Sequence, residues 1–321
     1  MRSHRWPLSS CQTIDATVTT PLRFVDRGTV AASLPPVVEQ VKLAARVYRA
    51  MARGEVEMPP KIGVHPRPDA FLHAMPAYLR ELDIVAMKWV SGYPDNPARG
   101  LPAISGVIVV NDASTGVPLA VLDAAEITAA RTAAASGACV QAFAPAGWNV
   151  VAVLGCGEQG RYHCQVLRAL NPECEIRAYD PVTERAREVC PGAIVADDPR
   201  AAVAGADVVV TAGPILRDPP SPLDESWLED DVLLLPIDFD FYVSADAVAA
   251  CDLFLTDDVA QYGAYREHGY FRSWPDAHAS VGEGLEQALI ARRVVCANLG
   301  VGALDAAFAH AVLSRVGHGL A

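Results

Sequence analysis

Six consecutive residues, Gly155-Cys156-Gly157-Glu158-Gln159-Gly160, have the spacing GxGxxG between an apolar run at 149–154 and a segment with helical character at 159–170. In this context the first glycine permits a tight turn, the second lets the backbone approach a pyrophosphate, and the third allows close helix packing. Amides at the helix N-terminus bind the phosphates without a charged side chain. The segment therefore predicts a dinucleotide site. Its expected residues are Gly155, Gly157, Glu158, Gln159 and Gly160.

A carboxylate further along the chain extends this predicted site. Asp180 follows the run 175–179, twenty-five residues after the first glycine, where a carboxylate accepts hydrogen bonds from the adenosine ribose hydroxyls. This position favours NAD. Arg185 and Arg187 lie nearby and leave NADP as an alternative, because an arginine can pair with a 2′-phosphate. A helix cap is the structural alternative for Asp180.

The chain around the turn alternates apolar runs with helical stretches, as expected of a doubly wound parallel sheet of Rossmann type. The runs lie at 149–154, 175–179, 193–195, 207–211, 232–235 and 252–256. Thr211 ends one of them, at the edge where open α/β sheets bind ligands. An ordinary strand terminus explains its position equally well.

The first third of the chain predicts an α+β domain. A helical period runs through 37–53, and residues 83–90 alternate so that Lys88 shares a face with small apolar residues. Turn-forming residues between 106–110 and 118–122 predict an antiparallel hairpin. An alanine-rich helix is expected at 126–143.

The two patterns predict two domains. Residues 131–296 form the dinucleotide-binding domain, and residues 1–130 with 297–321 form a substrate-binding and dimerisation domain. From Val294 the tail has a short strand and then a helix at 303–316, which we expect to pack back on the first domain. No function is assigned to residues 1–30.

Composition and charge narrow the kinds of partner. The 321 residues carry a net charge of −12 without any basic run, so we expect a small-molecule partner and no nucleic acid. The eight cysteines form no CxxC pair, which predicts reduced thiols in a cytoplasmic protein. No histidine spacing predicts a metal site. The uncharged stretch 132–157 is broken by polar and turn residues, so no membrane segment is predicted.

Three segments together carry a resemblance to a known family. They are Lys88-Trp89-Val90-Ser91-Gly92-Tyr93-Pro94-Asp95-Asn96 with Gly100-Leu101-Pro102, then Thr128-Ala129-Ala130-Arg131-Thr132-Ala133-Ala134, and the glycine turn with Gln159. In this order they resemble the ornithine cyclodeaminase and mu-crystallin family over roughly residues 35 to 315. The resemblance implies a dimer that binds NAD(P) in its second domain. It also implies hydride transfer between the cofactor and the α-carbon of an amino acid or cyclic imine.

The resemblance also implies roles for single residues. Lys88 matches a lysine that binds substrate, and Asp238 matches an aspartate that acts as acid or base. Arg131 matches an arginine at the cofactor phosphates. Asn298 and Leu299 match positions beside the nicotinamide and the substrate.

Physical chemistry supports these roles but also offers structural alternatives. Lys88 on an apolar strand face is costly unless it meets an anion such as a substrate carboxylate, whereas a snorkelling or salt-bridged lysine is the alternative. Arg131 could instead lie on a helix surface. Asp238 follows the apolar run 232–235, where partial desolvation raises the pKa of a carboxyl and suits it to proton transfer. A capped loop is its alternative and Asp240 its rival, and His73 is a further residue that could approach the substrate.

Two departures from the family pattern bear on the substrate. Lys61 stands after Pro60 where the family commonly has an arginine, so a point charge replaces a bidentate fork for a carboxylate. After Asp238, residues Phe239-Asp240-Phe241-Tyr242 replace a common Pro-Gly-Lys and add aromatic bulk. Both changes weaken a strict ornithine assignment.

The main hypothesis is an enzyme that oxidises an α-amino acid to an imine or reduces an imine. Lys61 and Lys88 would hold the carboxylate, and Asp238 would move protons. Cyclodeaminase, amino-acid dehydrogenase and ketimine reductase all remain open. The alternative class is a crystallin-like protein that binds the dinucleotide without turnover, against which the retention of Lys88, Arg131 and Asp238 counts.

Overall fold

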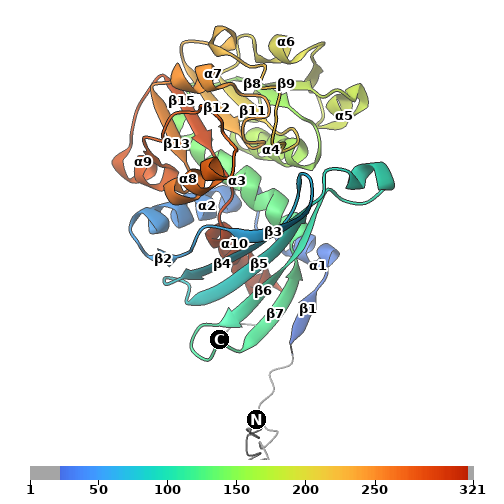
Figure 1. Cartoon of the computed structure of the whole chain (residues 1–321), viewed down its shortest axis with the longest axis vertical. Helices are drawn as coiled ribbons and strands as arrows, with labels where there is room; N and C mark the ends of the chain where they lie inside the picture. Colours follow the sequence, from blue (N-terminus) through green and yellow to red (C-terminus); the bar gives the residue numbers. More distant parts are fainter. Residues whose placement is uncertain (1–21, 317–321) are drawn as a thin grey trace, which may run out of the picture.

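The computed structural model describes residues 22–316, which build two sheets, one above the other in Figure 1. The first is seven-stranded, in the order β1-β7-β6-β5-β4-β2, with β3 paired to β4. All its pairs are antiparallel except β1 with β7. Its strands are β1 Arg23–Val25, β2 Val56–Glu57, β3 Ile62–Arg67, β4 Ala70–Leu79, β5 Ile84–Gly92, β6 Ile104–Asp112 and β7 Pro118–Asp123.

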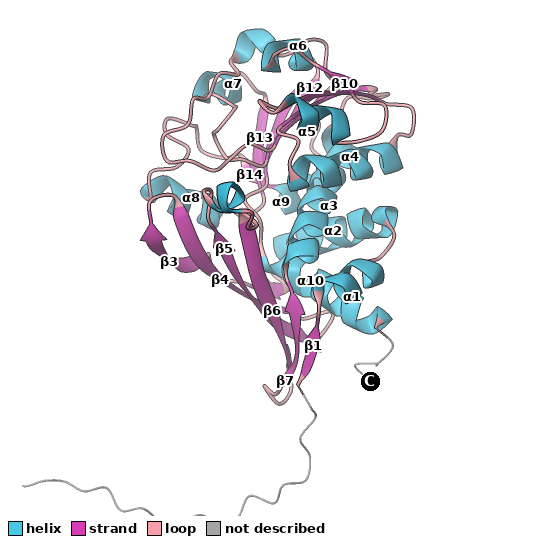
Figure 2. Cartoon of the chain, turned by 90° about the vertical axis from the view of Figure 1, so that its right-hand side faces the viewer, coloured by secondary structure: helices cyan, strands magenta, loops and turns pink. Residues whose placement is uncertain are grey.

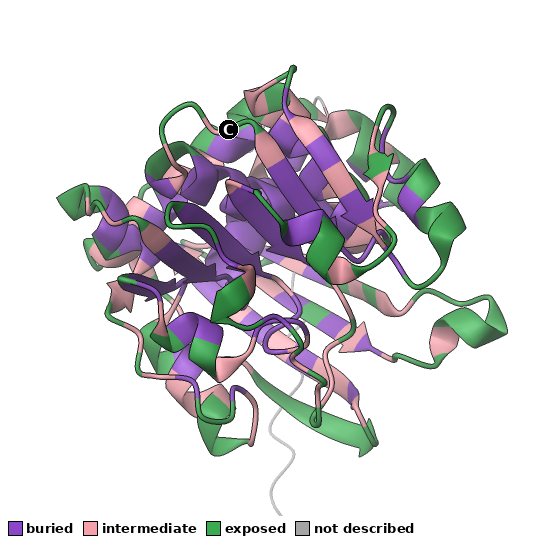
Figure 3. Ribbon diagram, turned by 90° about the horizontal axis from the view of Figure 1, so that it is seen from above, coloured by how far each residue is buried: buried purple, intermediate pink, exposed green. Residues whose placement is uncertain are grey.

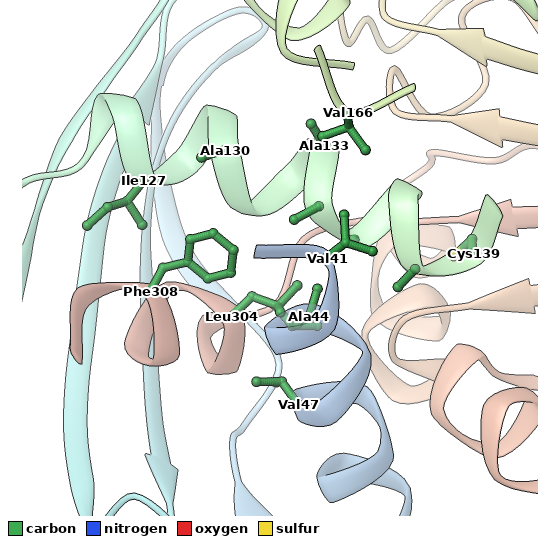
Figure 4. Close-up of a cluster of buried hydrophobic side chains, with 14 of the residues drawn as sticks. Val41, Ala44, Val47, Ile127, Ala130, Ala133, Cys139, Val166, Leu304 and Phe308 are labelled. Atoms are coloured by element: carbon green, nitrogen blue, oxygen red, sulfur yellow. The ribbon is translucent and has the colours of Figure 1, made fainter. Parts of the chain in front are cut away.

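Helices cover one face of this sheet (Figure 2). They are α1 Arg27–Ser33, α2 Val37–Ala52, α3 Ala125–Phe143 and α10 Gly302–Arg315. The helix α10 lies against β4 and β5, so the C-terminal helix returns to the first domain as expected. Figure 4 shows the core between these helices, where Ala44 of α2, Ile127 of α3 and Phe308 of α10 belong to one buried cluster.

The alternation predicted at 83–90 is confirmed in β5. Ile84, Ala86, Lys88 and Val90 are buried, while Trp89 on the opposite face is exposed. Because side chains of a strand point alternately to its two faces, Lys88 is placed under the covering helices. The predicted hairpin is β6 and β7, whose turn is held by Asp112 Oδ1 accepting from the amides of Ser114 and Thr115.

The second sheet has eight parallel strands in the order β10-β9-β8-β11-β12-β15-β13-β14. Its strands are β8 Val150–Leu154, β9 Glu175–Tyr179, β10 Ile194–Val195, β11 Val208–Thr211, β12 Val232–Pro236, β13 Leu253–Thr256, β14 Ala279–Ser280 and β15 Arg293–Ala297. The accompanying helices are α4 Glu158–Leu170, α5 Thr183–Glu188, α6 Pro199–Val203, α7 Ala245–Ala249, α8 Val259–Glu267 and α9 Val281–Gln287. Short 3₁₀ turns occur at η1 Asn96–Arg99 and η2 Glu225–Trp227.

The fold is therefore α/β, with a Rossmann-like parallel sheet beside a mixed-sheet domain. The tail is divided between the two domains, since its strand β15 pairs between β12 and β13 of the second sheet. The strand is apolar and buried, which suits the centre of a parallel sheet, so only the following helix crosses back. Seen from above, buried residues lie along the inner strands and exposed residues on the outer helices and loops (Figure 3).

Parallel pairing brings the carboxyl ends of four strands to the edge of the second sheet that lies near the first domain. Thr211 ends β11, Asp238 follows β12, Asp257 follows β13 and Asn298 follows β15. This edge is where open α/β sheets bind ligands. Within residues 22–316, no helix is long and apolar enough to cross a membrane.

Candidate active site between the two domains

The glycine turn after β8 has distinct requirements at its three glycines. Gly155 has a left-handed backbone, with a φ of +96°, and a Cβ on it would lie 2.4 Å from the carbonyl oxygen of Ala212. A Cβ on Gly160 would lie 2.3 Å from the carbonyl oxygen of Gly155. A Cβ on Gly157 would meet nothing within 4 Å. The first and third glycines are thus required by packing, whereas the space in front of the second is open, as a pyrophosphate site needs.

The N-terminus of α4 completes this turn. Among the described residues no side chain caps it. Glu158 is held beside the turn by an ion pair with Arg27 of α1 at 2.9 Å. The side-chain oxygen of Gln159 is buried without a partner in the described part of the chain. Uncapped amides beside an open face fit the phosphates of a dinucleotide.

Asp180 connects β9 to the glycine turn. Its Oδ2 accepts from the amide of Cys156 at 2.9 Å, and its Oδ1 accepts from the amide of Val182 at 2.8 Å. The second contact is a local bond to the backbone two residues further on, but it is not a helix cap: the N-cap of α5 is Val182, and within the described residues no side chain caps that helix. Its contact with a ribose stays a prediction, consistent with its place at the end of β9.

Asp238 lies buried at the carboxyl edge of the second sheet. Thr211 Oγ1 donates to Asp238 Oδ1 at 2.5 Å, and the amide of Gly213 donates to Oδ2 at 2.8 Å. Burial raises the pKa of Asp238 to about 7, although both hydrogen bonds oppose the rise. The next residue, Phe239, has a φ of +64°, a left-handed conformation that a bulky residue rarely adopts. This carboxyl is therefore held in place and suited to proton exchange near neutral pH.

The rival Asp240 has different surroundings. It too is buried, and burial raises its pKa, but its backbone partners are Phe271 and Arg272 in the loop after α8. Its Oδ1 has no partner among the described residues. Thr211 and Gly213 hold Asp238, so Asp238 is the carboxyl fixed between the ends of β11 and β12.

A buried ion cluster joins β5 of the first sheet to two of the helices that cover it. Lys88 Nζ of β5 lies 2.8 Å from Asp305 Oδ1 of α10, and Arg131 Nε of α3 lies 3.1 Å from the same oxygen. The other oxygen, Oδ2, has no partner within the described chain. Burial lowers the pKa of Lys88 to about 7; Arg131 also lowers it, whereas Asp305 raises it.

This cluster decides between several sequence interpretations. Lys88 is salt-bridged, as one alternative held, and its partner is a residue that the sequence interpretation missed. Arg131 does not lie on a helix surface, because it is buried and packs beneath Gly300, where a Cβ would lie 2.7 Å from its Nη1. Asp305 could have been noticed as a lone charge inside the apolar helix α10, in which an unpaired carboxylate is costly.

Lys61 reaches the second domain from the start of β3. Its Nζ donates to the carbonyl of Leu299 at 2.6 Å and lies 5.3 Å from the ring centre of Tyr265. Burial lowers the pKa of Lys61 to about 8, and Asp257 opposes this shift. Asp257 Oδ2 accepts from the amide of Gly300 at 2.6 Å, and burial raises the pKa of Asp257 to about 6. Sequence interpretation missed Asp257, although it follows an apolar strand as Asp238 does.

Asn298 and Leu299 lie where β15 ends against the first domain. Asn298 Oδ1 accepts from the hydroxyl of Tyr48 in α2 at 3.1 Å. Leu299 takes part through its carbonyl, which accepts from Lys61. The loop therefore connects both domains, and its contacts with a nicotinamide or substrate stay predictions.

Aromatic rings connect Asp238 with the lysines. Phe239 packs on Tyr265 with ring centres 4.9 Å apart, and Tyr265 faces His73 at 6.5 Å. His73 stacks on Phe71, and its pKa is lowered to about 3, mainly by burial and by Lys61. His73 is thus a neutral neighbour of the lysines, within the candidate site.

A cavity of about 320 Å³ opens beside this site, between the tip of the β3–β4 hairpin and the second domain. Its lining includes His65, Arg67, Phe71, Arg217 and Tyr270. Phe71, which lines the cavity, stacks on His73. Lys88 and Asp238 are not among the lining residues and are buried.

Comparison with known proteins agrees with this arrangement. The model of the ornithine cyclodeaminase/mu-crystallin family matches residues 29–251. A nodulation efficiency protein from Rhizobium meliloti is 36% identical over 251 residues, covering 76% of this chain and 78% of that protein.

Two solved structures share the whole architecture. An archaeal alanine dehydrogenase dimer with bound NAD has a TM-score of 0.79 at 25% identity, covering 92% of this chain and 96% of its own. The Δ¹-pyrroline-2-carboxylate reductase of Thermococcus litoralis, in complex with NADH and L-proline, has a TM-score of 0.81 at 21% identity, covering 92% and 97%. The family match spans more than half of the sequence. This chain belongs to the ornithine cyclodeaminase/mu-crystallin family.

Proposed function

We propose that the protein is an NAD-dependent oxidoreductase that acts on the C–N bond of a small α-amino acid or of the corresponding imine. The observation that carries this proposal is that a buried carboxyl suited to proton transfer lies near a group of buried cations, at one edge of the second sheet. Asp238, with a pKa raised to about 7, lies one aromatic contact away from the residues around Lys61. Lys88 and Arg131 form the adjoining cationic cluster.

Each group has a defined task in this proposal. The nicotinamide would supply or accept the hydride at the α-carbon. Lys61 and Lys88 would bind the substrate carboxylate. Arg131 was expected at the cofactor phosphates, but its Nε shares one Asp305 oxygen with the Lys88 ammonium, so we assign it to the substrate carboxylate instead. Asp238 would take a proton from the amine nitrogen during oxidation and return one to the imine nitrogen during reduction.

We place dehydrogenase or imine reductase ahead of cyclodeaminase. Cyclisation of a diamino acid requires space and a partner for a second amine. Around Asp238 the chain instead has Phe239, which packs on Tyr265, Tyr270 and Phe271. The aromatic surroundings favour a compact, largely apolar substrate side chain. The matching architectures include an alanine dehydrogenase and a lysine cyclodeaminase alike, so this ranking rests on the aromatic surroundings of Asp238.

A substrate panel tests this proposal. Purified protein with NAD is offered alanine, proline, ornithine and lysine; with NADH it is offered Δ¹-pyrroline-2-carboxylate, and pyruvate with ammonia. Absorbance of the reduced nicotinamide and release of ammonia are followed. Turnover of alanine, proline or their imines supports the proposal. Ornithine turnover with ammonia release and a cyclic product would instead identify a cyclodeaminase.

The second candidate is a protein that binds the dinucleotide without turnover. The burial of Lys88, Arg131 and Asp238 counts against it, because desolvated charges are costly to keep without a use. Saturable NADH binding with no turnover on any member of the panel would support this candidate and contradict the enzyme proposal.

NAD is the proposed cofactor, with NADP as the alternative. The buried Asp180 lies at the end of β9, where a 2′-phosphate would meet a negative charge. Arg185 and Arg187 on α5 are exposed, and Arg187 pairs with Glu184. We expect NADH to bind more tightly than NADPH in a fluorescence titration.

We also propose a cytoplasmic homodimer. The seven cysteines of the described residues are free and buried, which supports a reducing compartment. The first domain is proposed as residues 1–130 with 297–321. Within residues 22–316, no helix covers the outer face of its sheet (Figure 2). A second copy of this chain is the proposed partner for that face.

A further inference from the structure

Lysine is rare in this chain, and its placement is informative. The sequence has three lysines, Lys42, Lys61 and Lys88, among 26 basic residues. Lys42 is exposed on α2, whereas Lys88 is 1% exposed and Lys61 contacts Tyr265 of the second domain. Lysine differs from arginine in losing its charge readily on burial. At Lys88 the charge therefore depends on the neighbouring groups.

Most of the ionisable groups around Lys88 are basic and disfavour the charged form of its side chain. Arg131, Lys61 and His73 are the basic groups nearby, and burial also disfavours the ammonium. Asp305 is the carboxylate that opposes them, through its 2.8 Å contact with Nζ. Thr128 adds a hydroxyl at 3.4 Å.

Asp305 is itself in an improbable place for a carboxylate. It lies in α10, flanked by Leu304 and Ala306, and is 1% exposed. One oxygen serves both Lys88 and Arg131, and the second has no partner among the described residues. A carboxylate used only to hold α10 in place would be expected to have both oxygens paired.

We propose that Asp305 is a positioning residue that fixes the Lys88 ammonium and the Arg131 guanidinium side by side and keeps Lys88 charged, so that the two cations bind a substrate carboxylate. The proposal rests on the proposed function, in which Lys88 and Arg131 bind that carboxylate. Nothing requires Asp305 to contact substrate. It acts through the lysine and the arginine.

The rarity of lysine makes a direct test feasible. Full-length protein labelled with ¹³C at lysine Cε has three lysine signals, which Lys88→Gln and Lys61→Arg variants assign. The signals are followed from pH 5 to pH 11 in the wild-type protein and in Asp305→Asn. We expect the titration midpoint of Lys88 to fall by one pH unit or more in Asp305→Asn, because burial and Arg131 then act unopposed. Lys42 should be unchanged.

Two comparisons separate this effect from general damage. Asp207→Asn removes a carboxylate that accepts from the amides of Asn149 and Val150 at the other end of the second sheet, and should leave the Lys88 midpoint unchanged. In the wild-type protein, the ¹³Cγ signal of Asp305 should change over the pH range in which Lys88 titrates. This measurement does not depend on the folding of any variant. The proposal is overturned if the titration midpoint of Lys88 is unchanged or higher in Asp305→Asn. It is also overturned if the Asp305 signal does not change as Lys88 titrates.

The kinetic consequence separates this inference from the proposed function. If the protein turns over amino acids or imines, Asp305→Asn should raise KM about tenfold or more, with a smaller change in kcat, and Asp305→Glu should recover part of the loss. An unchanged KM would contradict the inference while the function stands. If no substrate is turned over, the function fails, and the lysine titration still decides whether Asp305 governs the charge of Lys88.

Discussion

At the scale of single residues, burial brings the pKa values of a carboxylic acid and an amine close together. Burial raises the pKa of Asp238 to about 7 and lowers that of Lys88 to about 7. Desolvation has opposite signs for the two groups because it disfavours the charged form of each. A site with both can exchange protons near neutral pH while it binds an anion, which is the combination that amine and imine chemistry requires.

Replacing Asp238 tests its proton-transfer role. Asp238→Asn keeps the size of the side chain but cannot accept a proton, so we expect kcat to fall by about 10²- to 10⁴-fold. NADH affinity, measured by fluorescence titration, should change little because the carboxyl is not part of the glycine turn. Turnover equal to wild type in Asp238→Asn would rule out this role.

The pH dependence of turnover should reveal the same group. Oxidation needs Asp238 ionised, so its rate should rise as pH increases through about 7; reduction needs it protonated, so that rate should fall over the same range. Initial rates of oxidation and of reduction, measured across this pH range, give the two profiles, and Asp238→Asn should lose the pH dependence of both. If both rates changed in the same direction with pH, a different group would be titrating.

The raised pKa of Asp238 also makes the stability of the folded protein depend on pH. Because the folded-state pKa of Asp238 lies above the unfolded value, its contribution to the free energy of unfolding is complete below the unfolded value, near pH 4. It is lost as pH rises through about 7. Stability of the wild-type protein from this group therefore declines over that window.

At the scale of elements, the glycine turn and α4 act as one unit. Gly155 and Gly160 are packed against backbone, whereas Gly157 faces open space with an ordinary φ of −76°. The three glycines of one motif are thus required for different reasons, two by folding and one by the expected ligand.

Matched alanine variants should separate these reasons. Gly157→Ala should fold with an unchanged melting temperature and bind NADH at least about tenfold more weakly, since the added methyl occupies the phosphate side of the turn. Gly160→Ala should lower the melting temperature, because its Cβ would lie 2.3 Å from a carbonyl oxygen. Gly263→Ala on α8, where a Cβ also meets nothing, is the control: it should leave NADH binding unchanged and should raise the melting temperature, if it changes it, because alanine is the better helix former. Normal NADH binding by Gly157→Ala would contradict the assigned site.

At the scale of the whole molecule, the outer face of the first sheet is apolar. Ile62, Ala74, Trp89 and Val107 are register partners across β3, β4, β5 and β6. Their side chains lie opposite the buried face that carries Lys88, and Phe24 on β1 shares this outer face at 78% exposed. An apolar sheet face that no helix of the described part of the chain covers is typical of a subunit interface.

Charges on this face should separate the subunits. We expect the wild-type protein to be dimeric in sedimentation velocity at micromolar concentration and the double variant Phe24→Glu, Val107→Glu to be monomeric with unchanged circular dichroism. Ile290→Glu, at a residue 96% exposed in the second domain, is the control and should stay dimeric. A wild-type monomer at that concentration would contradict the dimer.

The sequence by itself determined the features that depend on neighbours along the chain. The glycine turn, the alternation around Lys88 and the strand that ends before Asp238 follow from local backbone geometry and from side-chain periodicity, which are legible in short windows. The family resemblance added the residues that a site should contain, and the structure brings Lys61, Lys88, Arg131 and Asp238 to the junction of the two sheets.

Only the tertiary structure decided which polar groups the buried lysines contact. Lys88 and Asp305 are 217 residues apart in the chain, and Lys61 and Leu299 are 238 apart, so no short window contains either pair. The place of β15 within the second sheet also depends on the tertiary structure, because its partners β12 and β13 come from elsewhere in the sequence. The electrostatic energy of a buried charge depends on every group within a few ångströms. Those groups are brought together by packing, and so the charge state of Lys88 is a property of the fold.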